Sequence, residues 1–142
     1  MELSKVKDAF EFIREAWQRA NALREEAITC RLSATGGAIR YDKDRVQTSP
    51  QDYQAKWIDR AADLDKEADK VLEMADGVRD MAYSWIKAAC KPNEEFVLMQ
   101  HYFLGKPYNV IKDEYICMFD YGSKTTMFEV AQRGMRRIAE KL

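Results

Sequence analysis

The feature that most constrains this sequence is a heptad pattern of apolar residues in the middle of the chain. Such residues alternate in steps of four and three, which places them on one stripe of a helix that packs lengthwise against other helices. The pattern comprises Trp57, Ala61, Leu64, Ala68, Val71, Ala75, Val78, Ala82, Trp85 and Ala89. We expect one long helix over about residues 50–91, capped by Ser49 and stopped by Pro92. At Gly77 we expect either a kink or a close approach of another helix.

A second amphipathic pattern precedes the first. Its apolar residues are Leu3, Val6, Phe10, Ile13, Trp17 and Ala20, continuing less regularly through Leu23, Ala27 and Cys30. They predict a helix over about residues 2–30. Antiparallel packing of the two helices buries both stripes, so we expect a helical hairpin over residues 1–91. A heptad stripe can also meet its copy in a second chain, so a homodimer through these helices stays open.

The stretch between the two patterns, residues 33–48, has no apolar period. We expect a solvated loop there. Asp42 and Asp44 have the spacing that opens a calcium loop, but the glycine and the closing glutamate of that motif are absent at the required offsets. The loop interpretation is therefore favoured over a metal site.

The C-terminal third reads as three short helices separated by glycines. Asn93 is the expected N-cap of the first helix, which should end near Gly105. Gly122 ends the second helix, and Ser123 caps the third. Three short helices with glycines at the corners are typical of a helix-turn-helix. We expect an all-α chain in which such a domain, residues 93–142, follows the hairpin.

Composition excludes several broad classes. A formal charge of -1 and a pI of about 5.9 argue against a protein that coats nucleic acid or an anionic membrane with its whole surface, although a local basic face remains compatible. The three cysteines share no metal-type spacing and read as free thiols in a reducing compartment. The first residues show no basic segment followed by an apolar run, and no stretch approaches about 18 uninterrupted apolar residues, so we expect neither export nor a membrane span. We expect a cytoplasmic protein without a membrane partner.

Enzyme motifs are absent from the sequence. His101 is the only histidine, and it lies among apolar residues, so a core or boundary position is expected rather than a catalytic one. No zinc-protease motif, serine elbow, phosphate-binding glycine loop or paired metal-ligand set is present. We expect no catalytic activity, no cofactor and no metal.

The last helix carries the candidate binding residues. When its apolar stripe is turned inward, a polar ridge is left on the opposite side. That ridge holds Thr125, Glu129, Gln132 and Arg136, with Arg133 beside it and Lys124 at the N-terminal corner. A glutamine side chain can form two hydrogen bonds with adenine, and a glutamate can accept one from cytosine. Lysine and arginine can donate to guanine or to phosphate. An ordinary charged solvent face explains the same composition, and on composition alone it is the favoured interpretation.

Two stretches of the sequence resemble a known family. One is RYDKDRVQTSP at residues 40–50. The other begins with Tyr102, Gly105 and Tyr108 and continues as Ser123-x-x-Thr126-Met127-x-x-Val130-x-x-x-Gly134-Met135-x-x-Ile138. The chain resembles small proteins encoded by phages and prophages of Gram-positive bacteria, grouped with the RinA and ArpU late-gene regulators. Their C-terminus is similar to region 4 of sigma factors. The chain departs from the pattern at two points. Gly134 replaces an alanine, and the Ile-Ala pair that usually begins the middle helix appears either at Ile111-Lys112 or at Ile116-Cys117.

The resemblance implies a DNA-binding transcriptional regulator of phage genes whose last helix enters the major groove. Lys124, Thr125, Phe128 and Glu129 occupy the positions that commonly meet bases. The backbone contacts are expected from the three arginines of the helix, Arg133, Arg136 and Arg137. The expected partner is double-stranded DNA. Two alternatives stay open: a helical module that dimerises or grips RNA polymerase without binding DNA, and a helical virion or packaging component.

Overall fold

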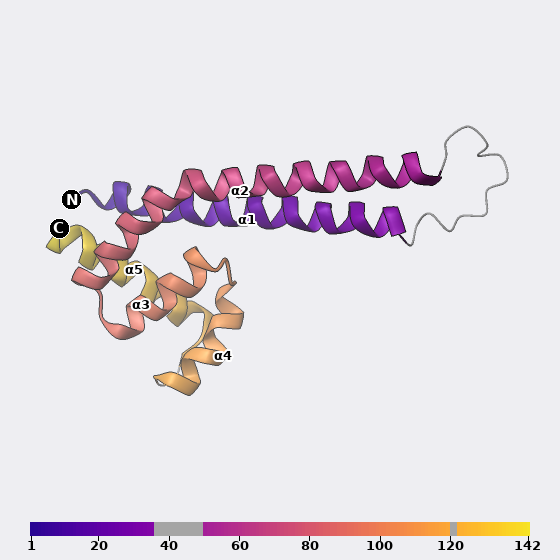
Figure 1. The fold of residues 1–142 in the computed structure, drawn as a ribbon. Helices are drawn as coiled ribbons and strands as arrows, with labels where there is room; N and C mark the ends of the chain where they lie inside the picture. The colour runs from indigo at the N-terminus through magenta and orange to yellow at the C-terminus, as the bar shows by residue number, and fades with distance from the viewer. Residues whose placement is uncertain (36–49, 120–121) are drawn as a thin grey trace. The chain divides into compact units, whose positions relative to one another are not determined.

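The computed structural model describes residues 1–35, 50–119 and 122–142, and every regular element among them is helical (Figure 1). The elements are α1 (Leu3–Thr35), α2 (Pro50–Ala89), α3 (Pro92–Leu98), the π-helical η1 (Met99–Phe103), α4 (Tyr108–Met118) and α5 (Lys124–Lys141). The expected all-α class and the long N-terminal pair of helices are confirmed.

α1 is longer than the sequence pattern predicted. It ends at Thr35 rather than near residue 30, because Ala34 continues the buried stripe and the Thr35 hydroxyl donates to the carbonyl of Arg31 at 3.1 Å. The remainder of the expected loop, the Asp42 and Asp44 pair and the Ser49 cap lie outside the described residues.

α2 runs without interruption through Gly77. A Cβ atom built on this glycine has no described atom within 4 Å outside its own helix neighbourhood. Of the two possibilities named for Gly77, the close approach is therefore not found among the described residues. Gly134, inside α5, does allow a close helix approach, because a Cβ atom there would lie 2.8 Å from Leu98 Cδ1 and 3.2 Å from Glu94 Cβ of α3.

These two glycines give a matched pair of predictions. Gly77→Ala should stabilise the chain by about 1 kcal/mol, since alanine has the higher helix propensity and the site is open. Gly134→Ala gains the same propensity but overpacks a buried contact, which costs about 1–3 kcal/mol, so a net loss of about 1 kcal/mol is expected. Thermal unfolding followed by circular dichroism should show a higher midpoint for the first variant and a lower one for the second. Midpoints that move in the same direction would contradict this account.

The chain divides into two compact units, and the second, Arg19–Leu72, is a two-helix segment. Its core joins Ala27 and Cys30 of α1 to Ala61 and Leu64 of α2. Ion pairs link the two helices at Arg19–Glu67, Arg24–Asp69, Arg31–Asp65 and Glu26–Arg60. The two α1 residues nearer its start, Arg19 and Arg24, pair with positions 67 and 69 of α2, whereas Glu26 and Arg31 pair with positions 60 and 65, so the pairing is antiparallel, as expected. Each exposed pair contributes under about 1 kcal/mol, so the pairs favour this register more than they stabilise the fold.

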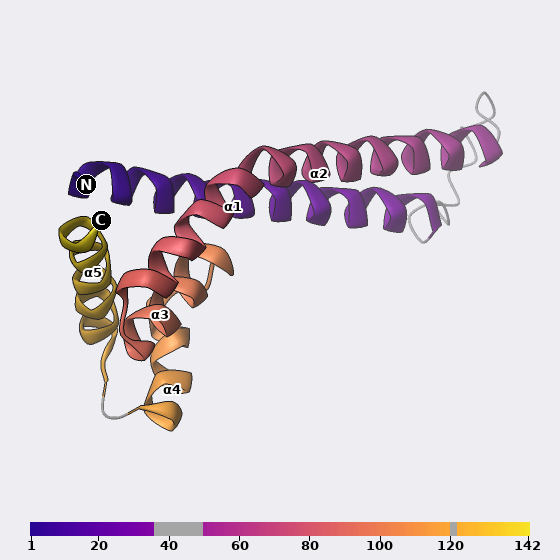
Figure 2. The ribbon, with the colours of Figure 1, turned by 60° about the vertical axis from the view of Figure 1, so that its left-hand side comes forward.

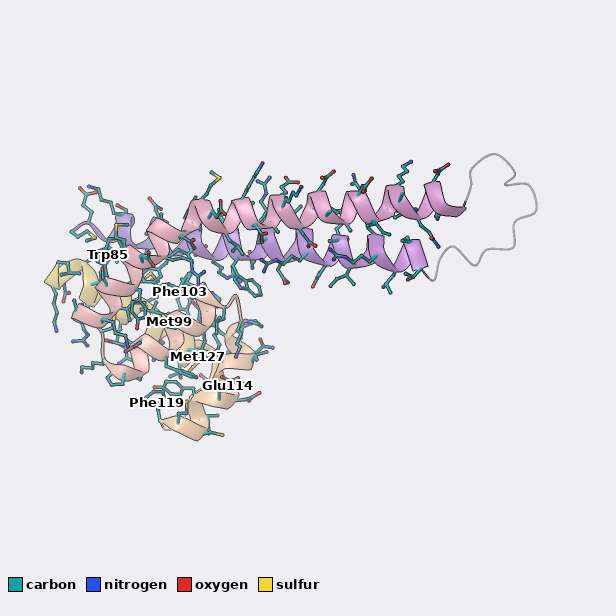
Figure 3. All side chains as sticks on the ribbon, viewed as in Figure 1. Trp85, Met99, Phe103, Glu114, Phe119 and Met127 are labelled. Carbon is teal, nitrogen blue, oxygen red and sulfur yellow. The ribbon has the colours of Figure 1, made fainter. Side chains whose placement is uncertain are left out.

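The first unit comprises Met1–Gln18 and Glu73–Leu142. One core joins Val6, Phe10 and Ile13 of α1 and Ala82 and Ile86 of α2 to buried residues of all the C-terminal helices. Phe103 and Met127, both labelled in Figure 3, belong to this core. The ends of the two long helices are therefore part of the same core as the C-terminal helices. The domain boundary expected at residues 91–93 stays a prediction about which part folds alone.

α3 begins two residues earlier than the capping pattern predicted. Lys91 is the N-cap, Pro92 occupies the first turn, and the Lys91 backbone N–H donates to Glu94 Oε1 at 2.9 Å. The expected N-cap, Asn93, lies inside the helix, and its side-chain amide lies 3.4 Å from the Tyr115 hydroxyl. The cap prediction was wrong because Pro92 begins the helix and the Glu94 carboxylate accepts from the N–H of the N-cap Lys91, which leaves Asn93 within the first turn.

Candidate nucleic-acid interface

The orientation of α5 about its own axis is fixed by a cap and by a buried stripe. Ser123 Oγ accepts a hydrogen bond from the Thr126 backbone N–H at 3.2 Å, which confirms the expected cap. The buried residues of the helix are Met127, Val130, Ala131, Gly134, Met135 and Ile138. α5 lies alongside α3 and packs on α4 (Figure 2). The opposite side of α5 is thereby turned outward.

The outward side holds most of the residues that the sequence predicted. Lys124, Thr125, Phe128, Glu129, Arg133 and Arg136 are exposed, and Gln132 is partly exposed. Five of them line one surface hollow: Phe128, Glu129, Gln132, Arg133 and Arg136. The structure therefore brings the candidate base-reading and phosphate-binding groups together on one accessible face. We call these seven residues the α5 ridge.

The cations of the α5 ridge are unneutralised. Lys124, Arg133 and Arg136 form no ion pair with any residue that the structure describes. A long basic side chain without a carboxylate partner is available to an anion, because no existing contact has to be broken first. The ridge therefore presents three positive charges to solvent on a chain whose formal charge is -1.

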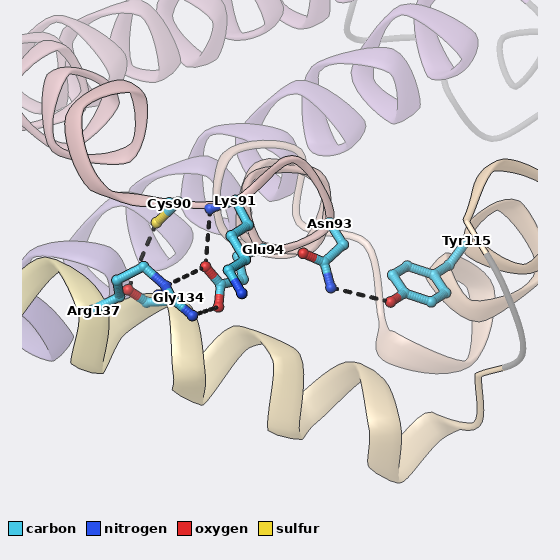
Figure 4. Close-up of polar contacts among 7 residues, drawn as sticks. All are labelled: Cys90, Lys91, Asn93, Glu94, Tyr115, Gly134 and Arg137. Atoms are coloured by element: carbon cyan, nitrogen blue, oxygen red, sulfur yellow. Dashed lines mark hydrogen bonds and ion pairs between the residues drawn. The ribbon is translucent and has the colours of Figure 1, made fainter.

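Arg137 is the predicted phosphate contact that the structure places differently. Its Nε and Nη2 atoms donate to the two carboxylate oxygens of Glu94, at 2.9 Å and 3.3 Å (Figure 4). The Glu94 side chain is 3% exposed, whereas that of Arg137 is 30% exposed. The guanidinium is thus held at the contact between α3 and α5 and neutralises a buried carboxylate.

A thiol two residues before α3 also contacts α5. Cys90 Sγ lies 3.6 Å from the Gly134 backbone carbonyl, which accepts its hydrogen bond (Figure 4). Burial raises the pKa of the Cys90 thiol to about 12, so it remains a protonated donor at neutral pH. Sequence reasoning missed the role of Glu94, whose only local signal is its place three residues after Lys91.

An array of rings lies behind Phe128. The Tyr108 ring meets the Phe128 ring edge-on, with centroids 6.0 Å apart and planes at 90°. Tyr108 also stacks on His101 at 3.9 Å, and His101 Nδ1–H donates to the Lys106 carbonyl at 2.7 Å. Burial lowers the pKa of His101, which keeps the ring neutral. His101 is 7% exposed and occupies the core position expected from the sequence.

The connection between α4 and α5 spans residues 119–123, of which 120 and 121 lie outside the described residues. α4 begins at Tyr108 and buries Ile111 and Tyr115. Both places considered for the displaced family pair, Ile111-Lys112 and Ile116-Cys117, fall within this one helix. A connection of this length is longer than the three- or four-residue turn typical of a helix-turn-helix.

Within the described ranges, no group of three or more His, Cys, Asp or Glu side chains is placed to hold a metal ion. None of the helices described is both long and apolar enough to span a bilayer.

Comparison with known proteins adds no relative: no family model, curated protein or solved structure matches the chain.

Proposed function

We propose that the chain is a non-enzymatic, DNA-binding transcriptional regulator of phage or prophage genes, in which α5 enters the major groove. The observation that carries this proposal is the α5 ridge itself, where three cations without ion-pair partners in the described chain lie beside groups suited to base edges.

The residues of the α5 ridge fall into two groups according to their distance from the start of α5. Lys124, Thr125 and Glu129 lie in the first two turns of α5, the part of a recognition helix that usually meets bases. Arg133 and Arg136 lie one to two turns later and are assigned to phosphates. Arg137 is assigned to positioning α5 through Glu94 instead of to a phosphate.

Binding of the full chain to duplex DNA tests the proposal. The probe is a fluorescein-labelled pool of 30-base-pair duplexes with a randomised centre, followed by anisotropy in 50–300 mM KCl. Saturable binding that weakens linearly with the logarithm of salt concentration is expected, because each neutralised phosphate releases counterions. Repeated selection should then enrich particular sequences. Absence of saturable binding at 50 mM KCl would overturn the proposal.

A second candidate is an interaction module that grips RNA polymerase without touching DNA. Apolar side chains exposed on α4 favour it, since Val110, Ile116 and Met118 are 43%, 47% and 62% exposed. The two candidates are separated by the same titration. The interaction-module hypothesis is supported if the chain binds RNA polymerase in a pull-down but binds no DNA duplex.

A further inference from the structure

Phe128 is an exception on its helix. All the other large apolar side chains of α5 are at most 1% exposed, whereas Phe128 is 49% exposed. It lies between Lys124 and Gln132 at four-residue steps, so the three side chains project from the same side of the helix. A phenyl ring therefore stands in the middle of a face that is otherwise polar.

The ring is also held in place. Its edge-to-face contact with Tyr108, and the stacking of Tyr108 on the hydrogen-bonded His101, support it from behind. An aromatic side chain that is already positioned loses little conformational entropy when a partner covers it. Phe128 is thus an exposed apolar surface that is ready to be buried.

The chemistry of the major groove leaves few partners for such a ring. The groove edges of adenine, guanine and cytosine present hydrogen-bonding groups, and the C5-methyl of thymine is the apolar group. Covering donors or acceptors with a phenyl ring would leave them desolvated and unpaired, which costs free energy. Thymine is therefore the base that Phe128 can cover with a net gain in binding free energy.

We infer that Phe128 is a specificity-determining residue that reads the C5-methyl group of a thymine, an inference that rests on the proposed insertion of α5 into the major groove. Gln132 lies four residues further along the same side, about 6 Å along the helix axis. Successive base pairs rise by about 3.4 Å, so Gln132 faces a base pair one or two steps away, where its amide suits adenine. The preferred site accordingly contains a thymine and, within two steps, an adenine.

The test replaces thymine by deoxyuridine, which removes only the methyl group. Duplexes enriched from the randomised pool are resynthesised with single deoxyuridine substitutions, and full-length wild type is compared with Phe128→Ala by anisotropy. At one thymine, substitution should weaken wild-type binding about fourfold, the value of one buried methyl group. Phe128→Ala should bind the thymine and deoxyuridine duplexes at that position equally. Phe119→Ala, which removes an exposed aromatic outside α5, is the matched control and should keep the fourfold difference.

The outcomes distinguish the inference from the proposal beneath it. If wild type binds duplexes but no deoxyuridine weakens binding, or if the loss persists in Phe128→Ala, the methyl-reading role is overturned while DNA binding stands. If wild type binds no duplex, the proposed function fails and the inference fails with it. Circular dichroism melting of Phe128→Ala should match wild type within about 3 °C, since half of the side chain is already in solvent.

Discussion

Alanine substitution of Lys124, Arg133 and Arg136 together is expected to weaken duplex binding by about two to three orders of magnitude in 0.1 M salt. None of the three has an ion-pair partner among the described residues, so each is available to DNA. Loss of the two phosphate contacts assigned to Arg133 and Arg136 should also flatten the slope of log affinity against log salt by about 1.8, because each contact contributes about 0.9. Anisotropy titrations over 50–300 mM KCl measure both quantities.

A charge-matched triple variant controls for net charge. Lys56, Lys66 and Lys70 are exposed on α2, and their replacement by alanine changes the formal charge by the same amount. This control should leave the slope within about 0.5 of wild type. Equal losses in the two triple variants would mean that the protein binds DNA through diffuse charge, and the assignment to α5 would be wrong.

Arg137→Ala should lower the unfolding midpoint by on the order of 10 °C, whereas Arg136→Ala should change it by less than about 2 °C. The two arginines are adjacent on α5, but Arg137 neutralises the buried Glu94 carboxylate and Arg136 is exposed and unpaired within the described chain. Removing the Arg137 side chain leaves the buried Glu94 carboxylate without its positively charged partner. Thermal denaturation followed by circular dichroism measures both shifts.

A double variant identifies the cause of that loss. Glu94→Leu combined with Arg137→Ala removes both charges. The unfolding midpoint of this double variant should therefore lie above that of Arg137→Ala, even though the hydrogen bond from the Lys91 backbone N–H to Glu94 is also lost. A double variant less stable than Arg137→Ala would show that the carboxylate stabilises α3 mainly through its backbone hydrogen bond. The DNA affinities of the two single variants should rank the other way: at temperatures where both are folded, Arg136→Ala should bind DNA more weakly than Arg137→Ala.

Local pattern predicted the helices because apolar spacing reports directly on which side of a helix is buried. The α1 and α2 stripes, the Ser123 cap and the inward stripe of α5 all follow from residues within a few positions of one another. The end of α1 was misjudged because a single alanine, Ala34, extended a stripe that had become irregular.

The local sequence pattern did not predict the role of Arg137. Helical spacing placed Arg136, and not Arg137, on the outward ridge, but it did not show what Arg137 contacts. Its partner, Glu94, lies 43 positions away in the chain. The Tyr108 support for Phe128 is likewise a tertiary contact, which helical spacing does not contain.

The shared core of the first unit also bears on synthesis. Phe10 of α1 shares this core with the helices after α2, and its ring packs on those of Tyr102 and Phe103 in η1. During translation this apolar part of α1 therefore stays incompletely buried until η1 has left the ribosome. A chain truncated before η1 would keep that apolar surface exposed to proteases.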